Sequence, residues 1–283
     1  MIDLHLHTTA SDGELSPTDL VARAAAAGLT IVAVTDHDTL AGLPEARDAA
    51  ARHAVRLIDG IEITAVEQGR DVHVLGYFMD AASATLLEFL RGQRADRIRR
   101  VRAMVERLAT LGFPVDIEPA LGRSATMPGR SVGRPLVADA LVAAGHAADR
   151  RDAFDRLLGF GRPAFVARCG ARVASVVATI HRAGGIASLA HPGLTRMDGE
   201  IPGYAEAGLD AIEAVHSDHD AEAERAYRHM AVRLGLAVSG GSDFHGQGSH
   251  HAPMLGLLSL PSGDFADLER RAAARAGGRM GDA

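Results

Sequence analysis

Short runs rich in Val, Ile and Leu alternate regularly along the chain with alanine-rich segments of helical character. Such an alternation is typical of repeated βα units around a mostly parallel sheet. Strands are expected at residues 2–6, 30–35, 56–64, 71–77, 186–190, 209–215 and 236–240, and helices at 16–27, 41–53, 172–183 and 219–235. This number of strands favours an α/β barrel over a small open sheet.

The alternation stops between about residues 80 and 170. Helical segments follow one another there without an intervening strand, at 83–111, 132–144 and 149–158. We therefore expect a barrel formed by residues 1–80 and 171–283, and a helical insertion, residues 81–170, that caps the active site.

The insertion is rich in arginine. Its first helix carries a dense arginine run, which is followed by a Gly-, Pro- and Ser-rich loop at 122–135. The run consists of Arg91, Arg94, Arg97, Arg99, Arg100, Arg102 and Arg107. A helix that bears so many arginines usually faces water. At the other end of the chain, the tail from residue 270 onward is expected to fray.

Composition narrows the class of protein. The chain of 283 residues can bury a full core, and its one cysteine, Cys169, excludes an intramolecular disulfide and a cysteine-based zinc site. The N-terminus lacks a basic lead before an apolar run, and no stretch approaches ~18 uninterrupted apolar residues. We expect a cytoplasmic protein that neither spans nor binds a membrane and has no obligate protein partner. The net charge of −6 gives no overall cationic field for nucleic acid.

The chain contains no lysine, so all 30 basic residues are arginines. This excludes a Schiff-base lysine, a phosphate-loop lysine and a carboxylated lysine that bridges two metal ions. Arginine favours forked, bidentate contact with phosphate, although a GC-rich genome would give the same bias.

Side chains that can bind metal ions follow the first strand. In Asp3-Leu4-His5-Leu6-His7, the alternation of a strand points His5 and His7 to one face and the two leucines to the other. The loop that leaves this strand supplies Asp12, at the strand end where barrel enzymes place catalytic groups. Two imidazoles on one face make half of a metal site.

The other strands repeat this pattern. The second ends in Asp36-His37, the third carries Glu62 among β-branched residues, and His73 belongs to the fourth. The full set of candidate ligands is His5, His7, Asp12, His37, Glu62, His73, His191, Asp243 and His245. Mixed imidazole and carboxylate ligands suit Zn, Mn or Fe, and nine ligands exceed what one ion can use. We therefore expect a multinuclear site.

The four blocks around His5/His7, Asp36/His37, His191 and Asp243/His245 resemble the motifs of the PHP (polymerase and histidinol phosphatase) family. The resemblance implies a distorted (β/α)7 barrel with two or three divalent ions, Mn²⁺ before Zn²⁺ or Fe²⁺. The implied ligand sets are His5, His7, Glu62 and Asp243 for one ion, Glu62, His73 and His191 for a second, and Asp12, His37 and His245 for a third. Many relatives carry histidine where this chain has Asp12.

The insertion and the segment 128–135 are similar to one branch of this family, the 3′,5′-nucleotide bisphosphate phosphatases and a related 5′-to-3′ exoribonuclease. Arg130 and Arg134, with Ser131 between them, flank a loop that leads into a helix and are expected to grip a phosphate. Arg94 and Arg97 are a second candidate pair for substrate. For all four arginines the alternative is a solvated position.

Two residues are candidates for catalysis. Glu62 is expected to bridge two ions that activate the attacking water. His216 ends a further strand, Ile212-Glu213-Ala214-Val215-His216, and is expected either to contact substrate and protonate a leaving oxygen or to orient a ligand histidine. Six further histidines, His53, His146, His181, His229, His250 and His251, are expected on the surface or in packing.

These residues lead to one expected function. We expect hydrolysis of the 3′-phosphate of a nucleoside 3′,5′-bisphosphate, with the second phosphate held by arginine. The first alternative is a nuclease that shortens small RNA from its 5′ end with the same ions. Another is a phosphatase for a small amine phosphate such as histidinol phosphate. The non-enzyme alternative is a metal-stabilised accessory module.

Overall fold

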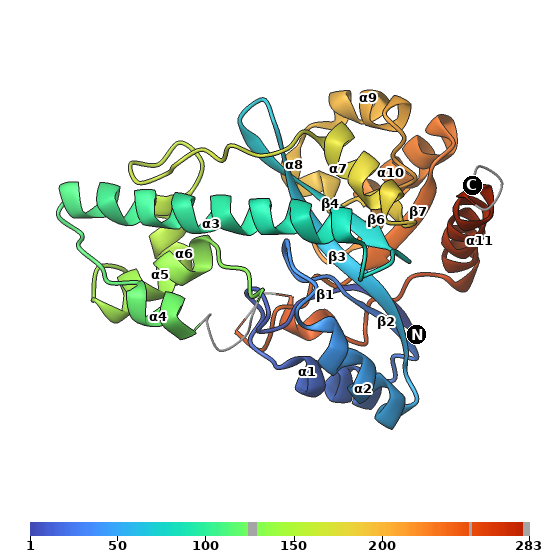
Figure 1. Ribbon diagram of the computed structural model, residues 1–283, viewed down its shortest axis with the longest axis horizontal. Helices are drawn as coiled ribbons and strands as arrows, with labels where there is room; N and C mark the ends of the chain where they lie inside the picture. Colours follow the sequence, from blue (N-terminus) through green and yellow to red (C-terminus); the bar gives the residue numbers. More distant parts are fainter. Residues whose placement is uncertain (124–128, 249–250, 280–283) are drawn as a thin grey trace.

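A computed structural model describes residues 1–123, 129–248 and 251–279. Seven strands form one sheet in the order β1-β2-β3-β4-β5-β6-β7. Their bounds are β1 Ile2–Leu6, β2 Ile31–Val34, β3 Arg56–Glu67, β4 Arg70–Tyr77, β5 Ile186–Leu189, β6 Ala211–His216 and β7 Ala237–Gly241. A bridge between Leu6 and Phe244 brings the two edges together, so the sheet is a nearly closed barrel. The expected α/β barrel is confirmed (Figure 1).

Strand β4 runs against its neighbours, whereas the other adjacent pairs are parallel. It returns from β3 through a tight turn at Gln68-Gly69, where both residues have positive φ. Because β4 is antiparallel, its beginning lies at the rim where the parallel strands end. The register pairs His73 with Thr64 and Leu75 with Glu62, which brings His73 to that rim.

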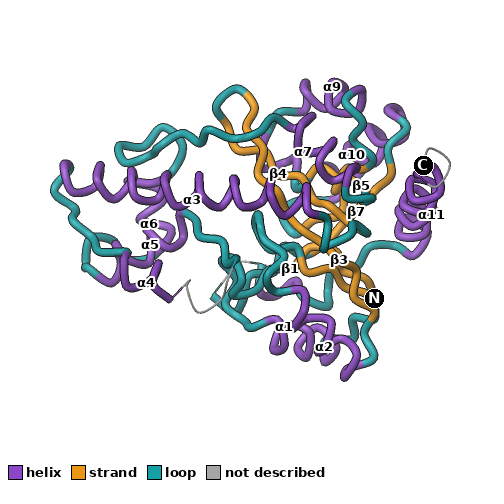
Figure 2. Tube along the Cα trace, in the orientation of Figure 1, coloured by secondary structure: helices purple, strands orange, loops and turns teal. Residues whose placement is uncertain are grey.

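Helices surround the barrel and form the insertion. Their bounds are α1 Pro17–Ala26, α2 Leu43–His53, α3 Ala84–Thr110, α4 Glu118–Arg123, α5 Arg134–Ala143, α6 Arg150–Ala153, η2 Phe154–Leu158, α7 Val173–Arg182, α8 Pro192–Thr195, η3 Asp198–Glu200, α9 Ile201–Glu206, α10 Ala221–Leu234, η4 Ala252–Met254 and α11 Ser262–Arg279. Helix η2 is a π-helical turn that continues α6, so the expected helix at 149–158 is two short pieces. Figure 2 shows the strands gathered in the barrel and the helices around and beside it.

Local sequence explains where the barrel helices begin and how they pack. Helix α1 starts after Ser16, whose Oγ accepts a hydrogen bond from the Asp19 backbone nitrogen. Helix α7 buries Val176, Val177 and Ile180, spaced at helical intervals, in the core that includes residues of β3 and β4. Each such side chain contributes about 1.5–3 kcal/mol by its burial.

Helix α3 takes part in two separate cores. Leu86 and Leu90, near its start, pack in the barrel core with α7. Val101 and Met104, further along, pack in a second core with α5 and η2. The helix therefore runs from the barrel into the helical insertion, as Figure 1 shows. The division of the chain at residues 81 and 170 stays a prediction.

The C-terminal region differs from expectation. The chain was expected to fray from residue 270, but α11 continues to Arg279. Phe265, Leu268 and Ala272 are buried and pack against Ala237 of β7. The expectation was wrong because these few apolar residues, spaced by three and four, provide a buried face within an Ala- and Arg-rich segment. In the described ranges, no helix has the length and apolar character required to cross a membrane.

Candidate metal centre

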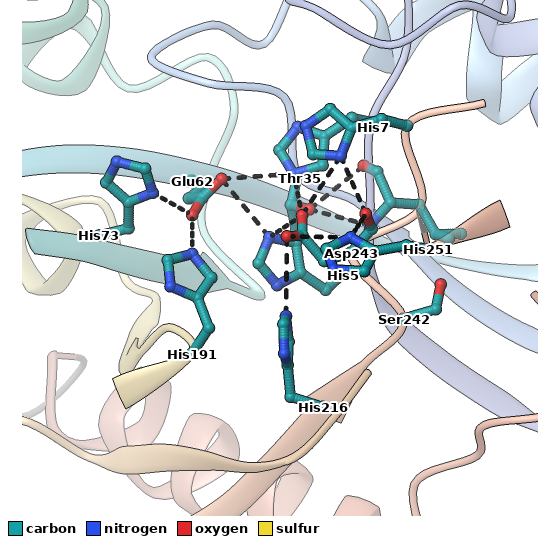
Figure 3. Close-up of polar contacts among 12 residues, drawn as sticks. His5, His7, Thr35, Glu62, His73, His191, His216, Ser242, Asp243 and His251 are labelled. Carbon is teal, nitrogen blue, oxygen red and sulfur yellow. Dashed lines mark hydrogen bonds and ion pairs between the residues drawn. The ribbon is translucent and has the colours of Figure 1, made fainter. Parts of the chain in front are cut away.

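Glu62 lies at the centre of the barrel rim and is fully buried in β3 (Figure 3). Its Oε1 atom lies 2.7 Å from Nδ1 of His73 and 3.0 Å from Nε2 of His191. Its Oε2 atom lies 2.9 Å from Nδ1 of His37. Burial alone would raise the pKa of this carboxyl, but the surrounding imidazoles, His37 first, hold the pKa well below its usual range. Glu62 is therefore a carboxylate shared by several histidines.

His5 on β1 and His7 just after the end of β1 lie side by side and face the same oxygens, as the strand alternation predicted. Their Nε2 atoms lie 3.4 and 3.3 Å from Oε2 of Glu62, and 3.3 and 3.2 Å from Oδ1 of Asp243. Leu4 of the same strand is buried in the hydrophobic core. The first predicted ligand set is thus brought together around two carboxylates.

A further group forms around Asp12 in the loop after β1. One carboxylate oxygen lies 3.7 Å from Nε2 of His37, and the other lies 3.4 Å from Nε2 of His245. Nδ1 of His7 lies 3.8 Å from the same Oδ1 atom, so His7 stands between this group and the first. All nine predicted ligands therefore converge at one rim, and their function as ligands stays a prediction.

Two of the candidate ligands have strained backbones. His191 follows β5 with φ of 26°, and Asp243 follows β7 with φ of 54°. A residue other than glycine that adopts a positive φ costs of order 1–3 kcal/mol of backbone strain. Both residues follow buried strands, and the strained turns aim their side chains at Glu62 and His5.

The donor atoms suit divalent cations. Triads and a tetrad of His, Asp and Glu offer one ligand atom each, all within 4.8 Å of one another. Within the described part of the chain, buried atoms including Nε2 of His5, Nε2 of His7 and Oε2 of Glu62 have no hydrogen-bond partner. Imidazole nitrogen and carboxylate oxygen are ligands that Zn, Mn and Fe accept. The residues present thus fit a multinuclear metal centre.

The pKa values of His7 and His37 shift in opposite directions. Burial would lower the pKa of His7, yet the carboxylates of Asp243 and Glu62 raise it to about 10. For His37 burial prevails, and its pKa falls to about 4. The pKa of Asp243 is held well below its usual range against burial, mainly by His5. Negative charge is therefore kept on the carboxylates at neutral pH.

Glu213 on β6 contacts two of the candidate ligands, His5 and His191. Its Oε1 atom lies 2.9 Å from Nδ1 of His5, and its Oε2 atom accepts a hydrogen bond from the His191 backbone nitrogen. The sequence places Glu213 in the strand that ends at His216, and no role was predicted for its side chain. The available signal was a lone acid in a buried β-strand, the same pattern that singled out Glu62.

His216 lies below Asp243, with its side chain fully buried and Nε2 3.6 Å from Oδ2 (Figure 3). It lines none of the hollows described below. His251, expected on the surface or in packing, is buried beside it: Nδ1 lies 2.9 Å from the Asp243 carbonyl oxygen and Nε2 lies 2.8 Å from Asp218. The arrangement favours a positioning role for His216. His250 lies outside the described residues.

A cavity of about 140 Å³ opens beside Asp12, His37 and His73. Four arginines line it: Arg97, Arg100, Arg134 and Arg168. Arg97 and Arg168 share Asp38, at 2.5 and 3.3 Å, and Arg100 and Arg134 share Asp71, at 3.1 and 3.6 Å. Four guanidinium groups therefore meet two carboxylates, which leaves excess positive charge next to the candidate metal centre.

This arginine cavity has unused hydrogen-bond capacity. Among the described residues, the buried Nη2 of Arg100 and Nε of Arg168 have no hydrogen-bond partner. Burial also lowers the pKa of Arg168 to about 10, and the nearby Arg97 adds to that effect. Buried cationic donors without partners are costly unless an anion can approach them.

The structure separates the predicted substrate residues. Arg97 and Arg134 line the arginine cavity. Arg130 and Ser131 line a neighbouring hollow of about 90 Å³ that also touches Asp12. Arg94 donates to the Asp38 carbonyl oxygen and lines a different hollow, beside Arg47 and Asp59.

Two cavity arginines were not predicted as substrate residues. Arg100 belongs to the arginine run, and Arg168 lies in a segment without a regular element. Part of the 122–135 loop, residues 124–128, lies outside the described residues.

The chain matches a family model and is similar in sequence to several characterised proteins. A family model described as the PHP domain matches residues 3–116. The chain is 37% identical over 248 residues to a 5′-3′ exoribonuclease from Haemophilus influenzae, covering 86% of this chain and 89% of the relative. It is 35% identical to a 3′,5′-nucleoside bisphosphate phosphatase from Chromobacterium violaceum, covering 87% and 88% of the two chains. It is 33% identical to a phosphoribosyl 1,2-cyclic phosphate 1,2-diphosphodiesterase from Eggerthella lenta, covering 87% and 94%.

Solved structures agree with these relatives. A crystal structure from Bifidobacterium adolescentis, assigned as a metal-dependent phosphoesterase, superposes with a TM-score of 0.87 at 34% sequence identity. The match covers 95% of this chain and 96% of the other. Barrel and insertion are therefore both included in the likeness.

Proposed function

The chain belongs to the PHP family and is a metal-dependent phosphoesterase, and from this premise we propose that it removes the 3′-phosphate of nucleoside 3′,5′-bisphosphates. The products would be a nucleoside 5′-phosphate and inorganic phosphate. The nine candidate ligands around Glu62 are called the ligand cluster below. The observation that carries the proposal is the arginine cavity beside this cluster. A substrate with two phosphates would place one at the ligand cluster and the other among the guanidinium groups.

The predicted ligands divide among two or three ions, with Mn²⁺ proposed before Zn²⁺ or Fe²⁺. His5, His7 and Asp243 would hold one ion, and His73 and His191 a second, with Glu62 shared between them. Asp12, His37 and His245 would hold a third. When bound, such ions supply a nucleophile at neutral pH and neutralise charge on a phosphoryl group.

The protein's own groups bind and orient the substrate. Arg134 has the weakest internal pairing of the cavity arginines, 3.6 Å from Asp71, and is the group most free to turn toward a phosphate. Arg100 and Arg168 offer the unpartnered nitrogen atoms, and fork geometry allows bidentate contact with phosphate oxygens. Holding the uncleaved phosphate in this way would fix the position of the reacting one.

Other side chains position the candidate ligands. Glu213 fixes the ring of His5 and the backbone of His191. His216, beneath Asp243, would position that carboxylate rather than touch substrate. Arg130 and Ser131, on the far side of Asp12, remain candidates for contact with a larger substrate.

A second candidate function is 5′-to-3′ removal of nucleotides from short RNA, the activity named for the Haemophilus relative. One observation favours it: a hollow of about 290 Å³ bordered by His73 and His191. A longer substrate could continue through this hollow. A small amine phosphate such as histidinol phosphate is disfavoured, because its cationic amine would meet four arginines. A non-enzymatic module would have no use for an arginine cavity beside the ligands.

Phosphate release with Mn²⁺ present tests the proposal. Adenosine 3′,5′-bisphosphate would be compared with 5′-AMP, 3′-AMP, histidinol phosphate and a short 5′-phosphorylated RNA. The proposal expects the bisphosphate to have the highest kcat/KM. Turnover of RNA without turnover of the bisphosphate would replace it with the nuclease function. A cytoplasmic location, with a small nucleotide as the only required partner, stays part of the proposal.

A further inference from the structure

A second hollow, here called the aromatic groove, lies next to the arginine cavity. It measures about 290 Å³ and is bordered by His73 and His191 of the ligand cluster. Its outer wall is formed by Phe160, Phe165 and Leu194. The phenylalanines come from the insertion and Leu194 from α8, so the groove forms where the insertion meets the barrel.

The apolar wall is exposed yet held in place. Phe160 is 66% exposed and Leu194 is 51% exposed, although both side chains are large and apolar. The Phe165 ring packs beneath the Arg100 guanidinium at 5.4 Å and meets the edge of Phe160 at 5.3 Å between centroids. The chain has only 8 phenylalanines, and Phe154, Phe160 and Phe165 all line the two hollows beside the ligand cluster. Apolar surface rimmed by polar groups marks a binding site.

The two hollows share three residues, Asp71, His73 and Arg134. Ligand cluster, arginine cavity and aromatic groove therefore meet at one place. Their sizes differ in a way that assigns them: at about 140 Å³ the arginine cavity falls below the usual range for a drug-sized ligand and suits a phosphate. The groove, at about 290 Å³, lies close to the lower end of that range and has an apolar wall.

We propose that the aromatic groove binds the nucleobase of the substrate by stacking on Phe160 and against Leu194. This inference rests on the proposed function. A nucleoside bisphosphate has two phosphates and one base, and each part has its own place around Asp71, His73 and Arg134. Because the wall of Phe160, Phe165 and Leu194 offers rings and methyl groups, the groove accepts different bases and favours the larger purine surface.

The test measures KM and kcat for two substrates, adenosine 3′,5′-bisphosphate and the same ribose bisphosphate without a base. The native protein is expected to show a KM for the abasic compound about ten-fold higher, from the usual strength of base stacking. Phe160→Ala and Leu194→Ala should each raise KM for the adenosine substrate and leave KM for the abasic compound unchanged. Phe160→Trp should retain the preference for the base.

Leu257→Ala is the matched control, because Leu257 is 75% exposed and lies outside the groove. Equal KM values for the native protein, Phe160→Ala and Leu194→Ala on the adenosine substrate would overturn the inference and leave the proposed function standing. An effect of Phe160→Ala on a trinucleotide alone would assign the groove to a following nucleotide and overturn it as well. Hydrolysis of p-nitrophenyl phosphate without turnover of the bisphosphate would refute both proposals.

Discussion

Nδ1 of His5 lies 2.9 Å from Oε1 of Glu213, and both side chains are fully buried. A carboxylate only accepts hydrogen bonds, so Nδ1 of His5 donates to Glu213, and Nε2 faces Glu62 and Asp243. Burial raises the pKa of Glu213, but His5 outweighs it and holds the pKa below its usual value. This pairing of a candidate ligand histidine with an outer carboxylate fixes the ring orientation that a metal site requires.

Glu213→Gln is therefore expected to lower metal affinity by about 10–100-fold, the usual effect of losing an outer partner. The neutral amide would leave His5 less basic, and its NH2 group would meet a donor at one end, either Nδ1 of His5 or the His191 backbone nitrogen. Competition with a chromophoric chelator measures the affinity. Asp210→Asn is the control, since Asp210 is buried but pairs with His181 and Arg275 away from the ligands. Equal affinities for Glu213→Gln and native protein would refute the positioning role.

Arg134→Met tests the arginine cavity. Loss of a charge-assisted contact of about 1.5–3 kcal/mol should lower kcat/KM for the bisphosphate by about 10–150-fold. Hydrolysis of p-nitrophenyl phosphate, which has no second phosphate, should change little. The matched control is Arg94→Met: Arg94 comes from the same predicted group but lines another hollow. If Arg94→Met impaired bisphosphate turnover as much as Arg134→Met, the cavity would not be the second phosphate site.

The Asp38→Asn variant should have a lower free energy of unfolding than the native protein. Asp38 is fully buried and pairs with Arg97 and Arg168, and breaking a buried pair costs about 3–5 kcal/mol. Guanidinium chloride unfolding at pH 7 measures the loss. Asp139→Asn, which removes an exposed pair with Arg150, should cost at most about 1 kcal/mol. A loss from Asp38→Asn as small as that control would contradict the buried pairing.

The contribution of Asp38 should also depend on pH. Burial is outweighed by Arg97 and Arg168, which lower the Asp38 pKa from 3.8 to about 2. A lowered carboxyl pKa stabilises the fold above the unfolded value, and this stability is lost as the pH falls through the folded value. The difference between native protein and Asp38→Asn should thus be full above about pH 4 and shrink towards pH 2. A stability difference between native protein and Asp38→Asn that grew as the pH fell through this interval would contradict the lowered pKa of Asp38.

The sequence predicted much of the barrel and the gathering of the candidate ligands at its rim, for reasons visible in particular residues. His5 and His7 alternate with leucines along β1 and the residue that follows it, and that alternation alone specifies a shared face. The direction of β4 was left unpredicted, although the connection from β3, Gln68-Gly69, is too short for the crossover that a parallel pair needs. The pairing of His73 with Thr64 of β3 places His73 in the first half of β4, at the rim where the candidate ligands lie.

The arginine cavity illustrates what sequence spacing does not contain. Arg100 and Arg168 are 68 positions apart and meet only because the insertion folds back on the barrel. Arg94 and Arg97, three apart on α3, looked equivalent in the sequence. Arg97 reaches Asp38 Oδ2, whereas Arg94 reaches only its carbonyl oxygen from the other side. Tertiary contacts separate residues that periodicity treats alike.

Metal binding should release protons. Asp243 and Glu62 hold the His7 pKa at about 10, so an ion that takes its Nε2 must displace a proton at neutral pH. Affinity for Mn²⁺ should therefore rise between pH 6 and pH 8, by about ten-fold per pH unit for each proton released. Calorimetry in buffers of different ionisation enthalpy counts these protons. Binding heats that are independent of the buffer would contradict the prediction.

The most direct test of the central claim is the metal content of the purified protein and of Glu62→Gln, measured by mass spectrometry of dialysed samples. Glu62 touches His37, His73 and His191 and faces His5, so its carboxylate joins the ligand groups. The native protein should retain two or three divalent ions per chain after incubation with Mn²⁺, and Glu62→Gln should lose at least one ion together with phosphate release from the bisphosphate. A native protein that binds no divalent metal under any condition, or a Glu62→Gln variant with unchanged metal content and turnover, would contradict the account.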